Sequence, residues 1–155
     1  MESAELKKTI ENFLMLIDRG MHSPQENERD LIISLDKLAL AASESMVIYD
    51  ESDYLGTSVE DEENLRSQIF TRFPDYGYYN IVGSISANIG ESEIEVGDAI
   101  DDLLDITKEL RCILNEWDEL GAEKAEAAFS AAYYYHIGDH LRELQLYLHA
   151  MNRNR

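Results

Sequence analysis

Residues 92–150 read SEIEVGDAIDDLLDITKELRCILNEWDELGAEKAEAAFSAAYYYHIGDHLRELQLYLHA. Apolar side chains recur in this segment every three to four residues, which predicts two amphipathic helices on either side of Gly121. The first stripe contains Val96, Ile100, Leu103, Thr107, Leu110, Leu114 and Trp117, and the second contains Phe129, Tyr133, Ile137, Leu144 and Leu148. A capping box of Ser92 and Glu95 starts the first helix, and Gly121 ends it. We expect a long antiparallel hairpin of helices 92–120 and 122–150.

The preceding part of the chain predicts three more helices. Their ranges are about 3–19, 23–46 and 58–73, with capping boxes at Ser23/Glu26 and Ser58/Asp61. Pro74 ends the third, because the residue before a proline disfavours helix. Residues 74–91 carry no helical pattern, and we expect an ordered loop with a little extended structure there. Residues 1–155 are therefore expected to form a single all-α domain, an antiparallel bundle of about five helices.

Composition excludes several classes of partner. The chain has 155 residues, 32 Asp and Glu against 13 Lys and Arg, and a formal net charge of -19. Nucleic acids and anionic membranes are bound through clustered cations, so neither is expected as a partner. One cysteine excludes an internal disulfide, and the start of the chain lacks the pattern of a signal peptide. We expect a cytoplasmic protein.

Negative charge is concentrated in the centre of the chain. Residues 50–105 contain 15 acidic side chains and two basic ones, Arg66 and Arg72. Such a segment is a solvated face, a cation site, or a docking surface for a basic protein with tyrosines as apolar anchors. The candidate binding residues are Glu60, Glu62, Glu63, Tyr78, Tyr79, Asp101 and Asp105.

The last expected helix carries a candidate metal site. His136 and His140 are four residues apart, so both rings reach one point, and Glu143 lies close to His140. Two imidazoles and a carboxylate on one helical face are plausible ligands of Zn²⁺ or Fe²⁺. Inward histidines in a helical bundle are more often satisfied by Tyr hydroxyls or backbone carbonyls than by a metal, and Tyr133, Tyr134 and Tyr135 supply such hydroxyls nearby. The candidate metal ligands are therefore His136, His140 and Glu143, and the sequence identifies no particular cofactor.

Two properties of the expected hairpin disagree about whether the aspartates join this site. If the two helices pair antiparallel about Gly121, residues whose numbers sum to about 242 lie at the same height along the hairpin. Asp101 and Asp105 then lie level with the two histidines. A helical wheel, however, places Asp98, Asp101 and Asp105 nearly opposite the apolar stripe, facing outward. A joint Asp/His site requires one of these two expectations to fail.

The combination of Asp101-Asp102-Leu103-Leu104-Asp105-Ile106 with the later His136-Ile137-Gly138-Asp139-His140 is similar to a bacterial helical family, numbered 5063 among domains of unknown function. In that family an acidic helix follows a Tyr-rich loop, which Tyr78 and Tyr79 match here. Ile137 stands where the family has tryptophan, and the Arg142-Glu143-Leu144 segment is shifted from the family's order. The resemblance implies a helical fold, implies no activity, and suggests that the aspartate and histidine helices form one unit.

Two functions follow from these features. The first is a non-enzymatic protein-binding module that uses the acidic centre to bind a basic partner. The alternative is a metal-dependent all-α hydrolase with Asp, His and Glu ligands on the two C-terminal helices. The chain has no Gly-rich phosphate loop, no G-x-S-x-G and no C-x-x-C, so the sequence does not decide whether the protein is an enzyme.

Overall fold

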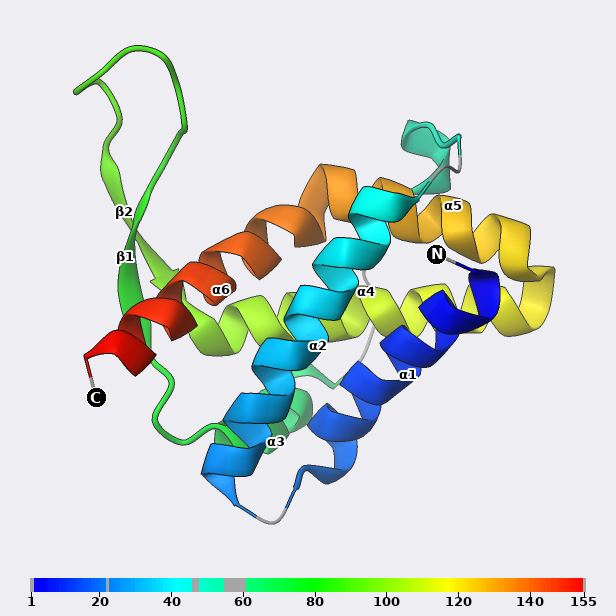
Figure 1. Ribbon diagram of the computed structural model, residues 1–155, viewed down its shortest axis with the longest axis horizontal. Helices are drawn as coiled ribbons and strands as arrows, with labels where there is room; N and C mark the ends of the chain where they lie inside the picture. The colour runs from blue at the N-terminus through cyan, green and yellow to red at the C-terminus, as the bar shows by residue number, and fades with distance from the viewer. Residues whose placement is uncertain (1, 22, 46–47, 55–60, 155) are drawn as a thin grey trace.

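The computed structural model describes residues 2–21, 23–45, 48–54 and 61–154, and the chain is mostly helical (Figure 1). The α-helices are α1 (Ser3–Arg19), α2 (Pro24–Glu44), α3 (Glu62–Arg72), α4 (Ala99–Leu120), α5 (Ala122–Ala132) and α6 (Gly138–Arg153). Shorter elements are the 3₁₀ turn η1 (Glu51–Asp53), the π-helical segment η2 (Tyr133–Ile137) and the strands β1 (Tyr78–Val82) and β2 (Ile94–Asp98). The expected helical bundle is confirmed. None of the helices described is long and apolar enough to cross a bilayer.

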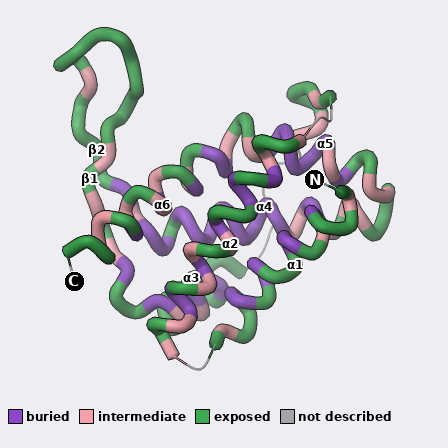
Figure 2. The backbone as a smooth tube through the Cα atoms, in the orientation of Figure 1, coloured by how far each residue is buried: buried purple, intermediate pink, exposed green. Residues whose placement is uncertain are grey.

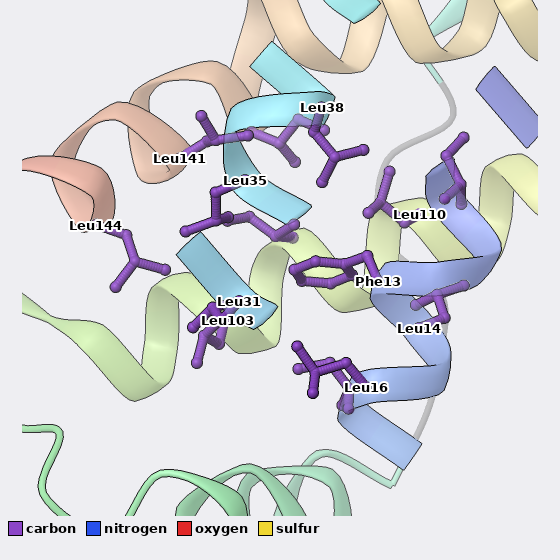
Figure 3. Packing of buried hydrophobic residues seen from close by; sticks show 14 of the residues in the cluster. Phe13, Leu14, Leu16, Leu31, Leu35, Leu38, Leu103, Leu110, Leu141 and Leu144 are labelled. Atoms are coloured by element: carbon purple, nitrogen blue, oxygen red, sulfur yellow. The ribbon is translucent and has the colours of Figure 1, made fainter. Parts of the chain in front are cut away.

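Helix α4 forms the centre of the bundle and contacts α1, α3, α5 and α6 (Figure 2). Leu103, Ile106 and Leu110 of α4 are completely buried, together with Phe13 of α1 and Leu35 of α2 (Figure 3). Unlike a surface helix, α4 also buries polar side chains, namely Asp102, Thr107, Lys108 and Glu109. Neighbouring elements therefore cover α4 over most of its circumference, and the functional site is built on a polar part of that covered surface.

Most of the expected helix boundaries are confirmed. Helix α1 ends at Gly20, whose positive φ of 67° suits glycine, and the Ser23 side chain accepts a hydrogen bond from the Glu26 amide at the start of α2. Helix α3 ends before Phe73, as Pro74 requires, but its start differs from the expectation, because Asp61 is the N-cap of the helix and not the capping-box partner of Ser58. Ser58 and Met46, where a helix start and a helix end were expected, lie outside the described residues.

The expected start of the fourth helix is wrong. Residues 94–98 form strand β2, which pairs antiparallel with β1 so that Tyr79 opposes Gly97 and Ile81 opposes Glu95. The cap of α4 is Asp98, whose side chain accepts a hydrogen bond from the Ile100 amide, and there is no capping box of Ser92 with Glu95. The alternation of glutamates with Ile94 and Val96 has the period of a strand, and that period prevails over the helical capping signal.

The expected single helix over residues 122–150 is interrupted. Helices α5 and α6 are joined through η2, in which a π turn accommodates one extra residue, and π turns are frequent at functional sites. Gly138 follows this turn, and a Cβ atom there would overlap the backbone carbonyl of Tyr133. The antiparallel pairing of α4 with α5 and α6 is nevertheless as expected.

Two buried leucines test the bundle packing. Leu110 of α4 and Leu144 of α6 have no exposed surface. We expect Leu110→Ala and Leu144→Ala each to lower the free energy of unfolding by about 2–5 kcal/mol in denaturant titrations, because each leaves a cavity. Leu146, which is 70% exposed on the same helix, supplies the control. An equal loss from Leu146→Ala would contradict the packing described.

Candidate metal centre

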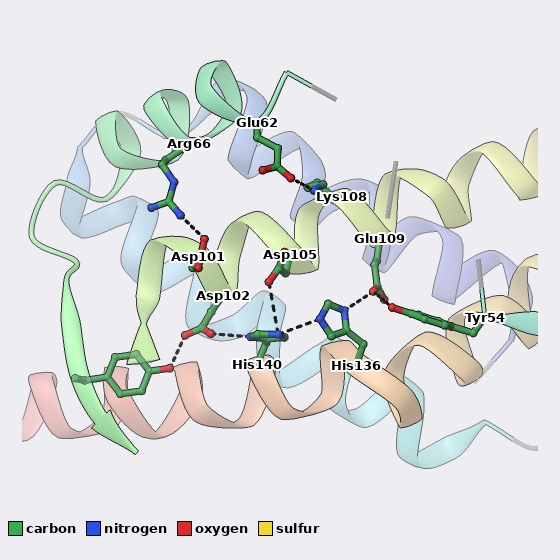
Figure 4. A network of polar contacts seen from close by, with 11 residues as sticks. Tyr54, Glu62, Arg66, Asp101, Asp102, Asp105, Lys108, Glu109, His136 and His140 are labelled. Carbon is green, nitrogen blue, oxygen red and sulfur yellow. Dashed lines mark hydrogen bonds and ion pairs between the residues drawn. The ribbon is translucent and has the colours of Figure 1, made fainter. Parts of the chain in front are cut away.

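Three acidic residues of α4 face two histidines across the C-terminal hairpin (Figure 4). Asp102, Asp105 and Glu109 come from α4, whereas His136 lies in η2 and His140 in the first turn of α6. The aspartates of α4 and the two histidines lie at the same height along the hairpin, as expected, since the contacting pairs are Asp102–His140 and Glu109–His136. The expected outward direction of Asp105 was wrong. A joint Asp/His cluster therefore exists.

Asp102 fixes the orientation of His140. Its Oδ1 lies 2.8 Å from Nδ1 of His140, and the Asp102 side chain is only 5% exposed. An ionised carboxylate can only accept hydrogen bonds, so Nδ1 of His140 is protonated and is the donor of this hydrogen bond. The phenol of Tyr79 donates a second hydrogen bond to Asp102, and this bond together with burial raises the pKa of Tyr79. The Nε2 atom of His140 is thereby left to act as a ligand or a base.

Glu109 holds His136 in the same way. Its Oε1 accepts from Nδ1 of His136 and, at 2.8 Å, from the phenol of Tyr54. Burial raises the pKa of Glu109, whose side chain is 1% exposed, and burial with the Glu109 contact raises the pKa of Tyr54 to about 12. Both histidines thus have one nitrogen fixed by a buried carboxylate that a tyrosine also bonds, the arrangement that orients metal-binding histidines.

The free nitrogens of the two rings point at one another. The Nε2 atoms of His136 and His140 are 3.2 Å apart, and Oδ2 of Asp105 is 3.6 Å from Nε2 of His140. Two imidazole nitrogens bound to one tetrahedral zinc ion at about 2.0–2.1 Å would lie about 3.3 Å apart. One donor atom from each of Asp105, His136 and His140 falls within 4.8 Å of the others. The three side chains have the separations of a mononuclear site.

The burial of these residues divides them by role. The side chains of His136, His140 and Asp105 are 31%, 27% and 28% exposed, whereas those of Asp102 and Glu109 are almost fully buried. The three potential ligands are therefore accessible from solvent, and the two residues that orient the rings are not.

Glu143 is not part of the cluster. It lies one turn beyond His140 on α6, is half-buried, and does not belong to the group of donor atoms that lie close enough to share an ion. Burial and the neighbouring Asp102 carboxylate raise its pKa. Asp105 occupies the carboxylate position that the sequence pattern assigned to Glu143.

Two other acidic candidates, Asp101 on α4 and Glu62 on α3, form ion pairs. Arg66 bonds Asp101, and burial, partly offset by Arg66, raises the pKa of Asp101. Glu62 pairs with Lys108, and in Figure 4 both ion pairs lie on the side of α4 away from the histidines. The structure thus brings Asp105, but not Asp101, to the histidine site.

The remaining candidate binding residues are dispersed. Tyr78 is 78% exposed on the hairpin, and Glu63 is exposed on α3. Tyr79 faces inward, stacks on Tyr147 with ring centroids 4.8 Å apart, and bonds Asp102, so it belongs to the histidine site. Glu60 lies outside the described residues.

Sequence reasoning missed three residues of the site, Asp102, Glu109 and Tyr54. Asp102 and Glu109 are seven residues apart, the spacing of one helical face, and this spacing was an available signal. It was not used because a helical wheel built on one apolar stripe treats the rest of the helix as exposed, whereas α4 also buries Asp102 and Glu109. Tyr54 reaches Glu109 from a distant part of the chain, and no local pattern predicts that contact.

Comparisons with models of protein families, with curated proteins and with solved structures find no match to this chain. The resemblance to the family numbered 5063 stays a prediction.

The charge of His140 makes the metal-free fold dependent on pH. The Asp102 hydrogen bond raises the pKa of His140 above 6.5. A raised pKa in the folded state means that protonation stabilises the fold, and this contribution is complete below the unfolded pKa of about 6.5. It is lost as the pH rises through the folded pKa. We expect the melting temperature of chelator-treated protein to fall between about pH 6 and pH 8.

His140→Gln is the variant that tests this expectation, because glutamine can still donate to Asp102 but does not titrate. Thermal unfolding with chelator across this pH range should show a smaller fall for His140→Gln than for the unaltered chain. Identical pH profiles for the two proteins would contradict the assignment.

Proposed function

We propose that this protein binds one divalent transition-metal ion through Nε2 of His136, Nε2 of His140 and the carboxylate of Asp105. The observation that carries the proposal is the 3.2 Å separation of the two Nε2 atoms, each on a ring whose Nδ1 is bonded to a buried carboxylate. With both Nδ1 atoms protonated, two neutral rings would direct lone pairs at each other. A cation between them removes this repulsion.

A shared proton is the simpler cation, and two features favour a metal over it. Asp105 adds a third donor atom to the pair, which a proton bridge between two nitrogens does not need. Both rings also have a buried carboxylate behind them, whereas a single imidazolium would need only one. Two histidines with one carboxylate are a ligand set for Zn²⁺ and for Fe²⁺.

Three protein ligands would leave at least one coordination position open, and the partial exposure of all three side chains supports access of solvent to that position. A metal-bound water there would be activated for attack on a substrate, so metal-assisted hydrolysis is the reaction that the arrangement supports. The carboxylates of Asp102, Asp105 and Glu109 more than balance the charge of one divalent ion. We therefore expect an uncharged or cationic substrate.

A phosphorylated substrate fits this site poorly. Arg66 of α3 pairs with Asp101, and Lys108 of α4 pairs with Glu62. Neither side chain is left to neutralise a phosphate group, and both pairs lie across α4 from the histidines (Figure 4). A hydrolase of phosphoanhydrides is therefore less suited to this site than a hydrolase of an uncharged or cationic substrate.

Calorimetric titration of the metal-free protein with Zn²⁺ tests the proposal. We expect one ion per chain for the unaltered protein and a loss of affinity of at least about a hundredfold for Asp105→Asn, which removes a ligand. Glu109→Gln, which alters only the hydrogen bond that orients His136, should lower the Zn²⁺ affinity about 10–100-fold. Asp101→Asn is the matched control, since it removes the same charge from the far side of α4.

The circular dichroism spectra of the metal-free variants establish that each is folded. Equal Zn²⁺ affinity of Asp105→Asn and Asp101→Asn would mean that general negative charge, and not this ligand set, attracts the ion. Absence of stoichiometric binding to the unaltered protein would refute the proposed function.

A further inference from the structure

The two faces of the β-hairpin differ in chemistry. Tyr79 stacks on Tyr147 of α6, so its face of the hairpin is the one turned toward α6. Residues directly opposite one another in an antiparallel pair share a face, which places Ile81 and Glu95 on the same side as Tyr79. The other face carries Tyr78, Asn80, Val82, Ile94, Val96 and Asp98. Its apolar members are 54–78% exposed, and Figure 1 shows the hairpin projecting from the bundle.

Among the described residues β2 pairs with β1 alone, so its other edge is free, and the two faces of the strand at this edge differ in polarity. Ile94 is 74% exposed and Val96 71% exposed on the face away from α6. Glu95 points to the other face, and Glu93, two residues earlier, follows the same alternation. A strand laid beside β2 would therefore have apolar neighbours on one face and two carboxylates on the other.

The backbone of β2 is also oriented for pairing. Gly83 donates to the carbonyl of Glu93, and Ala99 donates to the carbonyl of Gly77, which fixes the odd-numbered residues of β2 as the hydrogen-bonded positions toward β1. In an antiparallel ladder the intervening residues point their amide and carbonyl groups away from the partner strand. The backbone groups of Ile94 and Val96 thus point to the free edge. Such an edge is a template for another strand.

Charge decides which strand fits this edge. Residues 73–107 contain eight acidic side chains and no lysine or arginine, and the whole chain carries -19. A second copy of the chain would bring the same charges and be repelled, and so would an anionic membrane surface. A partner with lysine or arginine beside Glu93 and Glu95 would be attracted and correctly registered.

We infer that the free edge of β2 binds a strand of a partner protein in which apolar residues alternate with lysine or arginine. The apolar side chains cover Ile94 and Val96, the cations pair with Glu93 and Glu95, and the backbone groups of Ile94 and Val96 complete a three-stranded sheet. This recognition mode draws affinity from backbone hydrogen bonds and specificity from alternate side chains. It is independent of the metal site.

The test uses the full chain, labelled with ¹⁵N, and the peptide acetyl-Lys-Val-Lys-Val-Lys-Val-Lys-amide. On addition of this peptide we expect hydrogen exchange of the Ile94 and Val96 amides to slow at least about tenfold, because paired edge amides are protected. Two matched peptides, with glutamate in place of lysine or serine in place of valine, should leave both amides unprotected. Protection by the serine peptide would show that charge alone attracts the peptide, and it would overturn the inference.

Charge reversal gives the complementary arm. The double variant Glu93→Lys, Glu95→Lys should prefer the glutamate peptide. The control is the double variant Glu119→Lys, Glu123→Lys, which makes the same charge change at exposed positions beside the α4–α5 turn. It should still prefer the lysine peptide. An unchanged preference in the first variant would overturn the assignment of the edge. Sedimentation without peptide gives a further outcome that would overturn the assignment. If the unaltered protein sediments with twice the mass of one chain and Val96→Asp restores the mass of one chain, the edge binds a second copy.

Discussion

Addition of Zn²⁺ to the metal-free protein should raise its melting temperature by roughly 8–16 °C. An ion that binds only the folded state at a free concentration about 1,000 times its Kd stabilises it by about 4 kcal/mol. For a chain of this size about 1 kcal/mol corresponds to roughly 2–4 °C. The physical origin is the position of the three ligands, since Asp105 lies on α4 and the two histidines lie on η2 and α6. One ion would therefore cross-link the two arms of the hairpin.

Differential scanning calorimetry with Zn²⁺ and then with excess chelator measures this effect. His136→Ala should abolish the zinc-dependent rise, while His149→Ala should retain it, because His149 is exposed on α6 and outside the cluster. A rise of equal size in both variants would place the ion elsewhere. A melting temperature insensitive to zinc and chelator would contradict the metal site.

Replacement of Gly138 by alanine should disrupt the site from the backbone. A Cβ atom at this position overlaps the carbonyl oxygen of Tyr133, and backbone yields less readily than a flexible side chain. We expect Gly138→Ala to lower the free energy of unfolding by about 1–3 kcal/mol, as overpacking does. Because His136 and His140 lie on either side of Gly138, the same shift should separate their Nε2 atoms and weaken Zn²⁺ binding by at least about tenfold.

Gly77→Ala is the control for this substitution. A Cβ atom at Gly77 would meet no other atom within 4 Å, and its φ is not positive. Urea unfolding and zinc titration of the two variants separate the steric effect of Gly138 from the general effect of replacing glycine. A Gly138→Ala protein with unchanged zinc affinity would show that the π-helical geometry of η2 is not required for the site.

The fold was predictable where local signals act alone. Ser23 before Pro24, Gly20 and Gly121 each mark a helix end through backbone chemistry that needs no distant partner, and the structure confirms them. The start of α4 was not predictable from its capping signal. Ser92 and Glu95 satisfy the capping pattern, but the alternation through Ile94 and Val96 is completed by pairing with β1, which is a non-local contact.

The site was predictable in part. The i, i+4 spacing of His136 and His140 identified both histidines, because that spacing is nearly preserved when they straddle a π turn. Glu143 was assigned by its spacing from His140, but Nε2 of His140 lies next to His136 and Asp105, so the carboxylate comes from α4 and not from α6. Asp105 was assigned outward because a wheel assumes one covered face, whereas α4 is covered on most sides.

X-ray absorption at the zinc edge of the stoichiometric Zn²⁺ complex examines the ligand set itself. We predict a first shell with two imidazole nitrogens at about 2.0–2.1 Å and oxygen ligands at about 2.0–2.2 Å, from Asp105 and from water. The imidazole outer-shell scattering should be lost in a His136→Ala, His140→Ala double variant. A first shell of oxygen atoms alone in the unaltered protein would contradict metal binding by His136 and His140.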